Sequence, residues 1–183
     1  MDYVVFMKYG THAGEGADRI IKRKNEEYSE TNRIYWGYNG TLCHPTTQVQ
    51  PFAQEATRSG KSVYLALSPT SSAPRITSEE ATHYSSDKEN WNSLPPGAKV
   101  TGSKYALVCG KLQKRSEKID LSEYSVGVGN SKGTPAPNYI KGQVDKGCLI
   151  RKKDGSSSEI PFSQSIQIDW ISRLVQPYSI FLK

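Results

Sequence analysis

Cysteine is scarce in this chain of 183 residues, and so is histidine. The three cysteines, Cys43, Cys109 and Cys148, lie far apart, and an odd number at wide spacing argues against a disulfide framework. The three histidines form no HxxxH pattern, and no CxxC pattern is present. We therefore expect no metal, no cofactor and a reducing compartment.

Long hydrophobic runs are also lacking. No window approaches the roughly eighteen apolar residues that a membrane-spanning helix needs. The first ten residues, MDYVVFMKYG, have neither the basic start nor the long apolar stretch of a secretory signal. These absences predict a cytoplasmic protein that does not interact with membranes.

Acidic residues are few in the last part of the chain. The net charge is +6, and residues 99–183 hold fourteen Lys and Arg against seven Asp and Glu. Residues 1–60 hold seven of each sign, so the basic excess lies in the C-terminal half. Such a distribution suits a surface that faces an anion, and it equally suits a solvated lysine-rich exterior.

The hydrophobic pattern predicts a single α+β domain over residues 1–183. Ala17, Ile20, Ile21, Lys24 and Tyr28 form one stripe of a helix of about sixteen residues. A second short helix begins near Pro51 and is closed by Gly60. Strands are expected at 3–8, 33–38, 61–67, 104–112, 124–129, 148–153, 158–162 and 178–182, with a polar, charged stretch between 112 and 124.

This order of elements favours a strongly bent antiparallel sheet, or a partial barrel, with about two helices near the N-terminus. Regular alternation of strands and helices is absent, which argues against a doubly wound nucleotide fold. Residues 68–90 are rich in Ser and Thr, so we expect a mobile loop there.

The densest block of candidate ligand-binding residues is 34–45, which reads IYWGYNGTLCHP. Trp36 and Tyr38 share one face of a strand, and with Trp91 they would form an aromatic clamp for a base. Asn39 and His44 would contact the polar edges of that base. Packing aromatics are the alternative interpretation of these rings. His44 is also the candidate acid-base residue, because imidazole titrates near neutral pH.

A second candidate site is the glycine-rich stretch 127–134. Gly127, Gly129 and Lys132 suit an anion cradle, in which backbone amides and one cation face a phosphate. An ordinary hairpin connection explains the same residues. Two clusters of basic residues are predicted to contact further phosphates, with a solvated face as the alternative: Lys111, Lys114, Arg115 and Lys118, and Arg151, Lys152 and Lys153.

These features predict a binding module without catalytic activity, whose ligand is a nucleic acid or a nucleotide. Two alternatives stay open. One is an enzyme that processes a nucleotide or phosphoester with His44 as acid-base and residues 68–86 as a lid. The other is a protein that binds or inhibits a protein partner.

Overall fold

The computed structural model describes residues 1–39, 45–71, 79–140, 146–153 and 165–183. Its elements are β1 (Tyr3–Tyr9), α1 (Ala17–Thr31), β2 (Ile34–Tyr38), η1 (Pro45–Val49), α2 (Gln50–Arg58), β3 (Val63–Pro69), β4 (His83–Ser85), β5 (Asn92–Ser93), β6 (Tyr105–Cys109), β7 (Gln113–Asp120), η2 (Leu121–Glu123), β8 (Tyr124–Val126), α3 (Ala136–Tyr139), β9 (Lys146–Arg151) and β10 (Ser165–Leu182). The described residues form a mixed, strand-dominated α/β structure.

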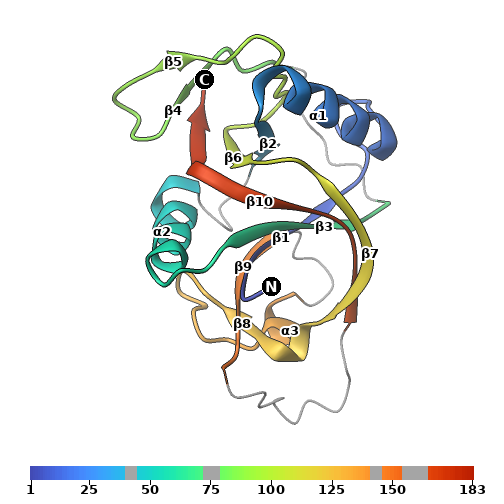
Figure 1. Ribbon diagram of the computed structural model, residues 1–183, viewed down its shortest axis with the longest axis vertical. Coiled ribbons are helices and arrows are strands. Elements are labelled where there is room, and N and C mark those ends of the chain that lie inside the picture. The colour runs from blue at the N-terminus through green and yellow to red at the C-terminus, as the bar shows by residue number, and fades with distance from the viewer. Residues whose placement is uncertain (40–44, 72–78, 141–145, 154–164) are drawn as a thin grey trace.

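The strands form one open sheet in the order β2-β6-β10-β3-β1-β9-β8, with β7 and β4 also paired to β10 (Figure 1). The α+β expectation and the early helices are confirmed at this coarse level. The sheet is not wholly antiparallel, however, because β1 and β3 are parallel along their whole length. The helices α1, η1 and α2 and the strand β2 lie between them in sequence, and this long connection returns the chain in the same direction.

β10 is much longer than the predicted final strand at 178–182. It pairs in turn with β7, β3, β6 and β4, so one strand joins most of the sheet. The register shifts between Leu174 and Ser179, where the strand bends. In Figure 1 this strand crosses the middle of the molecule and then turns toward the C-terminus.

β7 occupies the stretch that we predicted to be merely polar and charged. Residues 113–118 are all exposed, and within the described residues β7 pairs with β10 alone. Because these side chains are all exposed, no buried face imposes an alternation of apolar and polar residues, and the sequence carries no strand pattern there. Lysines on such an edge also discourage pairing with other chains.

The hydrophobic core lies on both faces of the sheet. Val5 and Met7 of β1 contribute to one cluster, together with residues of α1 and α2. Val4 and Phe6 contribute to the opposite cluster, with Leu121 and Ala136. The central strand β1 is therefore buried on both sides, which explains its continuous apolar sequence.

Other predicted elements fall partly outside the described residues. The hairpin around Asp154-Gly155 and its strand 158–162 lie there, as do residues 72–78 of the predicted loop at 68–90. The described part of that loop includes β4, which pairs with the C-terminal end of β10. Of the helices in the described residues, none combines the length and the apolar character needed to cross a membrane.

Candidate functional site

The candidate site is a cavity of about 420 Å³ at the end of the sheet where β1 and β2 finish. Its walls come from β1 and the turn after it, from α1, from β2 and from residues 99–103. Volumes of 300 to about 1,000 Å³ are typical of pockets for small molecules and cofactors. β1, β2, α1 and residues 99–103 therefore enclose a space of ligand size.

One wall of the cavity is aromatic. Trp36 and Tyr38 lie on the same face of β2 and are each about nine-tenths buried, at 7 % and 6 % exposure. The ring of Tyr9 stands edge-on to Trp36, with centroids 6.4 Å apart. The Nζ of Lys146 lies 5.4 Å from the centre of the Tyr38 ring, in cation-π distance. Trp36 and Tyr38 therefore pack in the hydrophobic core and also line the cavity.

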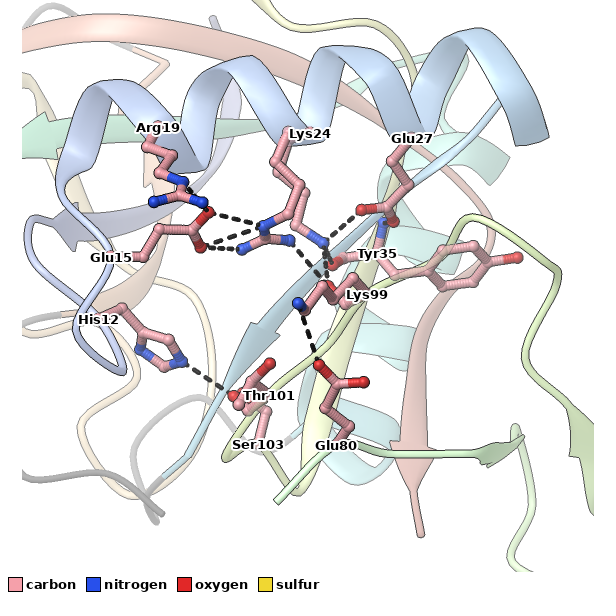
Figure 2. A network of polar contacts seen from close by, with 11 residues as sticks. His12, Glu15, Arg19, Lys24, Glu27, Tyr35, Glu80, Lys99, Thr101 and Ser103 are labelled. Atoms are coloured by element: carbon pink, nitrogen blue, oxygen red, sulfur yellow. Dashed lines mark hydrogen bonds and ion pairs between the residues drawn. The ribbon is translucent and has the colours of Figure 1, made fainter. Parts of the chain in front are cut away.

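The opposite wall begins with a tight turn between β1 and α1. His12 and Glu15 exchange two backbone hydrogen bonds of 2.9 Å around Ala13 and Gly14, which both have positive φ. This is the conformation of a two-residue hairpin turn, where glycine is the natural second residue. From this turn the side chain of His12 reaches Thr101 and that of Glu15 reaches Arg19 of α1 (Figure 2).

Residues 99–104, which we call the clamped segment, complete that wall. Nε2 of His12 donates to the carbonyl of Thr101 at 2.9 Å, which fixes the proton on Nε2. Asn39 holds the segment from β2, because its amide donates to Gly102 and its Oδ1 accepts from the Lys104 amide. His12, which follows β1, and Asn39, which follows β2, thus fix the irregular backbone of the clamped segment.

Gly37 explains how closely the clamped segment approaches β2. A Cβ at this position would lie 2.5 Å from both Ser103 Oγ and Val100 Cγ1. Only glycine leaves room for that contact without a shift of the segment. The glycine in the aromatic block of β2 therefore shapes the cavity rather than adding flexibility.

Arg23 joins α1 to the clamped segment. Its Nε and Nη2 donate to the carboxylate of Glu15, with a shortest distance of 2.7 Å, and Nη1 donates to the carbonyl of Lys99 at 3.0 Å. The hydrogen bonds from Arg23 hold the pKa of Glu15 below its ordinary value. The pair is partly exposed, with about one fifth of each side chain accessible.

Lys24 and Glu27 form a buried ion pair behind the same wall (Figure 2). Nζ of Lys24 donates to Glu27 at 2.5 Å, to the Tyr35 carbonyl at 2.6 Å and to the Lys99 carbonyl at 2.9 Å. Glu27 in turn accepts from the Tyr35 amide at 2.8 Å. Burial lowers the pKa of Lys24 to about 8 against the opposing effect of Glu27, and burial raises the pKa of Glu27.

The lining of the cavity is basic. Within the described residues it includes no Asp or Glu but five Lys and Arg residues: Lys8, Arg23, Lys24, Lys99 and Lys146. Three of these positive charges are paired with carboxylates that do not line the cavity. The pairs are Arg23 with Glu15, Lys24 with Glu27 and Lys99 with Glu80. The Lys99–Glu80 pair is more than half exposed, and such pairs contribute little to stability. The cavity therefore suits a neutral or anionic ligand better than a cation.

The structure brings three of the predicted ligand-binding residues together, because Trp36, Tyr38 and Asn39 all line the cavity. Trp91 lies outside the lining, where its Nε1 donates to the Lys88 carbonyl and Lys183 lies over its ring. His44 lies outside the described residues, so its proposed role stays a prediction.

The glycine-rich stretch 127–134 is also separate from the cavity lining. Gly127 faces Phe52, which a Cβ would approach to 2.7 Å, so close packing accounts for that glycine. The amides of four residues in this stretch already donate to backbone carbonyls: Gly127, Lys132, Gly133 and Thr134. Those four amides have protein acceptors in this arrangement, whereas the Lys132 side chain is exposed.

The predicted phosphate contacts do not line the cavity either. Lys111, Lys114, Arg115 and Lys118 are exposed on β7 or just before it. Arg151 is the last residue of β9, and Lys152 and Lys153 follow it. This end of β9 lies beside Tyr3, whereas the cavity lies at the Tyr9 end of β1. The basic residues that do line the cavity come from β1, α1, β9 and the clamped segment.

Sequence reasoning missed His12, Arg23, Lys99 and Lys146 as cavity residues. One signal was present, because Lys24 falls within the apolar stripe of α1 and a charged residue there needs a buried partner. For the others the sequence holds no periodic signal, since their positions depend on contacts across 75 or more residues, such as Arg23 to Lys99.

No group of three or more His, Cys, Asp or Glu side chains is placed to hold a metal ion in the part of the chain that the structure describes. Cys109 is buried, and its burial raises the pKa of the thiol, which makes it a poor nucleophile. Comparisons with protein-family models, with curated protein sequences and with solved structures found no match.

Proposed function

We propose that this protein is a binding module that accepts a nucleotide, free or within a nucleic acid strand, in the cavity beside β1 and β2. One observation carries the proposal: a cavity of about 420 Å³ combines aromatic rings with a basic lining that holds no carboxylate among the described residues. Aromatic faces stack on bases, and cations attract phosphates.

The polar groups of the lining support the same ligand class. Hydroxyl and amide side chains beside the rings can donate to or accept from a base edge, and they come from Thr11, Asn39, Thr70, Thr101 and Ser103. Lys8 and Lys146 lie at the same end of neighbouring strands, since Met7 pairs with Lys146 in the sheet. The ammonium group of Lys146 lies 5.4 Å from the centre of the Tyr38 ring, so its charge falls beside the aromatic wall, as a nucleotide with a base and a phosphate requires.

The proposal is tested by calorimetric titration with the four common ribonucleoside 5′-monophosphates and with short single-stranded oligonucleotides at two salt concentrations. We expect binding that weakens as salt rises, because phosphate contacts release counterions. Lys8→Ala and Lys146→Ala are each expected to weaken binding by about tenfold, the loss of one charge-assisted hydrogen bond.

Lys114→Ala and Lys118→Ala serve as matched controls, because both lysines are exposed on β7 and do not line the cavity. We expect them to leave mononucleotide affinity unchanged. If no nucleotide or oligonucleotide binds, the proposal is overturned. If the β7 variants weaken binding as much as the cavity variants, the contact surface is the exposed basic strand instead.

A further inference from the structure

We propose that Arg23 is the residue that recognises the anionic group of the ligand, and that this group is a phosphate monoester. The inference rests on the function proposed above and assigns the phosphate end of the site. It starts from the hydrogen bonds that the guanidinium already makes and from those that it leaves unmade.

A guanidinium group carries five N–H donors in a rigid plane. In Arg23, the Nε donor and one Nη2 donor are directed to Glu15, and one Nη1 donor is directed to the Lys99 carbonyl. One N–H on each terminal nitrogen therefore remains without an acceptor in the described part of the chain. The side chain lines the cavity and is 20 % exposed.

The plane of this guanidinium is fixed before any ligand arrives. The carboxylate of Glu15 accepts from Nε and Nη2 along one edge of the guanidinium, and the backbone of Glu15 is held by the hairpin turn that it forms with His12. The Lys99 carbonyl holds Nη1 from the clamped segment. A donor group that is already oriented loses little conformational entropy on binding, which favours affinity.

The neighbouring cations are less suited to this task. All three N–H donors of Lys24 are used by Glu27, Tyr35 and Lys99, and its side chain is only 4 % exposed. Lys99 carries an ammonium group without the planar fork of an arginine, and it pairs with Glu80 near the surface. Of these three, Arg23 is the residue that lines the cavity with unused N–H donors on a guanidinium already oriented by the protein.

A phosphate monoester matches the donors that remain. Its non-bridging oxygens can accept from both terminal nitrogens of one arginine, and this fork geometry is the usual reason for arginine at phosphate sites. Glu15 offsets the charge of Arg23 itself, and the described lining holds no Asp or Glu that would repel the anion. Arg23 determines where the anion binds.

The test compares each ribonucleoside with its 5′-monophosphate on the wild-type protein and on Arg23→Gln. The ratio of the two affinities measures what the phosphate contributes, and nucleoside binding reports an intact cavity in the same variant. We expect the phosphate to improve wild-type affinity by about tenfold or more, and Arg23→Gln to remove most of that gain.

Arg19→Gln is the matched control. Arg19 lies one turn earlier on α1 and also approaches Glu15, at 3.9 Å, but its side chain is 82 % exposed and does not line the cavity. We expect this variant to keep the full phosphate gain. Inorganic phosphate is a second probe, which should compete with the monophosphate on wild-type protein but not with the nucleoside.

Three outcomes separate this inference from the proposed function. If nucleosides bind and the phosphate gain survives in Arg23→Gln, the assignment to Arg23 is overturned while the proposed function stands. Equal loss of the gain in Arg19→Gln would show a general charge effect and would also overturn it. If Arg23→Gln abolishes nucleoside binding, Arg23→Lys provides the test instead. Full retention of the phosphate gain in Arg23→Lys would show that no forked contact is needed, and it would overturn the assignment.

Discussion

Lys24 illustrates how one side chain can link a helix, a strand and an irregular segment. Its ammonium group bonds Glu27 on α1, the Tyr35 carbonyl on β2 and the Lys99 carbonyl on the clamped segment. Burying a charge is costly unless it is paired and fully hydrogen-bonded. Here every donor is used, so the ion pair holds the rear wall of the cavity in one arrangement.

Glu27→Gln removes the charge that balances Lys24 while keeping the size of the side chain. We expect it to lower the free energy of unfolding by about 3 kcal/mol, because a buried ammonium is left unpaired. The measurement is chemical denaturation at neutral pH, with Glu26→Gln as control, since Glu26 is exposed on the same helix.

The double variant Lys24→Met with Glu27→Gln separates charge from packing. It leaves no buried charge, so we expect it to be more stable than Glu27→Gln alone. A double variant that is less stable than the single one would show that the carbonyl contacts of Lys24, rather than its charge balance, dominate.

At the scale of the element, short connections are held by side-chain hydrogen bonds as well as by strand pairing. The turn after β4 is built around Asp87, which accepts from Ser85, from the side chain and amide of Asn90 and from the Glu89 amide. The hydrogen bonds from Asn90, with those from Ser85 and Glu89, hold the pKa of Asp87 well below its ordinary value.

This lowered pKa predicts a pH dependence. The folded protein binds the Asp87 proton less readily than the unfolded chain, so Asp87 stabilises the fold above its unfolded pKa, near 3.8. The contribution is lost as the pH falls through the lower folded value. Thermal unfolding of wild type and Asp87→Asn should therefore differ at neutral pH and converge in acid. A constant difference at every pH would contradict the assignment.

At the scale of the whole molecule, stability is concentrated where the sheet is bonded on both sides. β1 pairs with β3 on one side and with β9 on the other, and four of its residues are buried. β7 has exposed side chains and pairs only with β10 among the described strands. The centre and the edge of the sheet should thus open with different free energies.

Amide hydrogen exchange measures this difference directly. We expect the amides of β1 and β3 to exchange slowest and those of β5 and of the outward side of β7 to exchange fastest. The physical reason is that central amides are freed only by global unfolding, while edge amides open locally. Equal protection of β7 and β1 would indicate a partner on the β7 edge.

The sequence alone predicted elements whose residues carry a periodic or apolar signal. α1 and the core strands β1, β2 and β3 were located to within a few residues, because their buried faces dictate which side chains they contain. The signal fails for β7, whose exposed residues obey no burial pattern, and for the parallel pairing of β1 with β3. Strand order depends on contacts between segments that local sequence does not encode.

For the site, the aromatic block of β2 was visible in the sequence because Trp36, Tyr38 and Asn39 are close neighbours in the chain. Its basic partners were not, since Arg23, Lys99 and Lys146 reach the cavity only when α1, the clamped segment and β9 come together. Local chemistry is thus determined by residue type and spacing. Which charge meets which ring was decided by tertiary structure, because packing of the sheet brings distant residues within hydrogen-bonding distance.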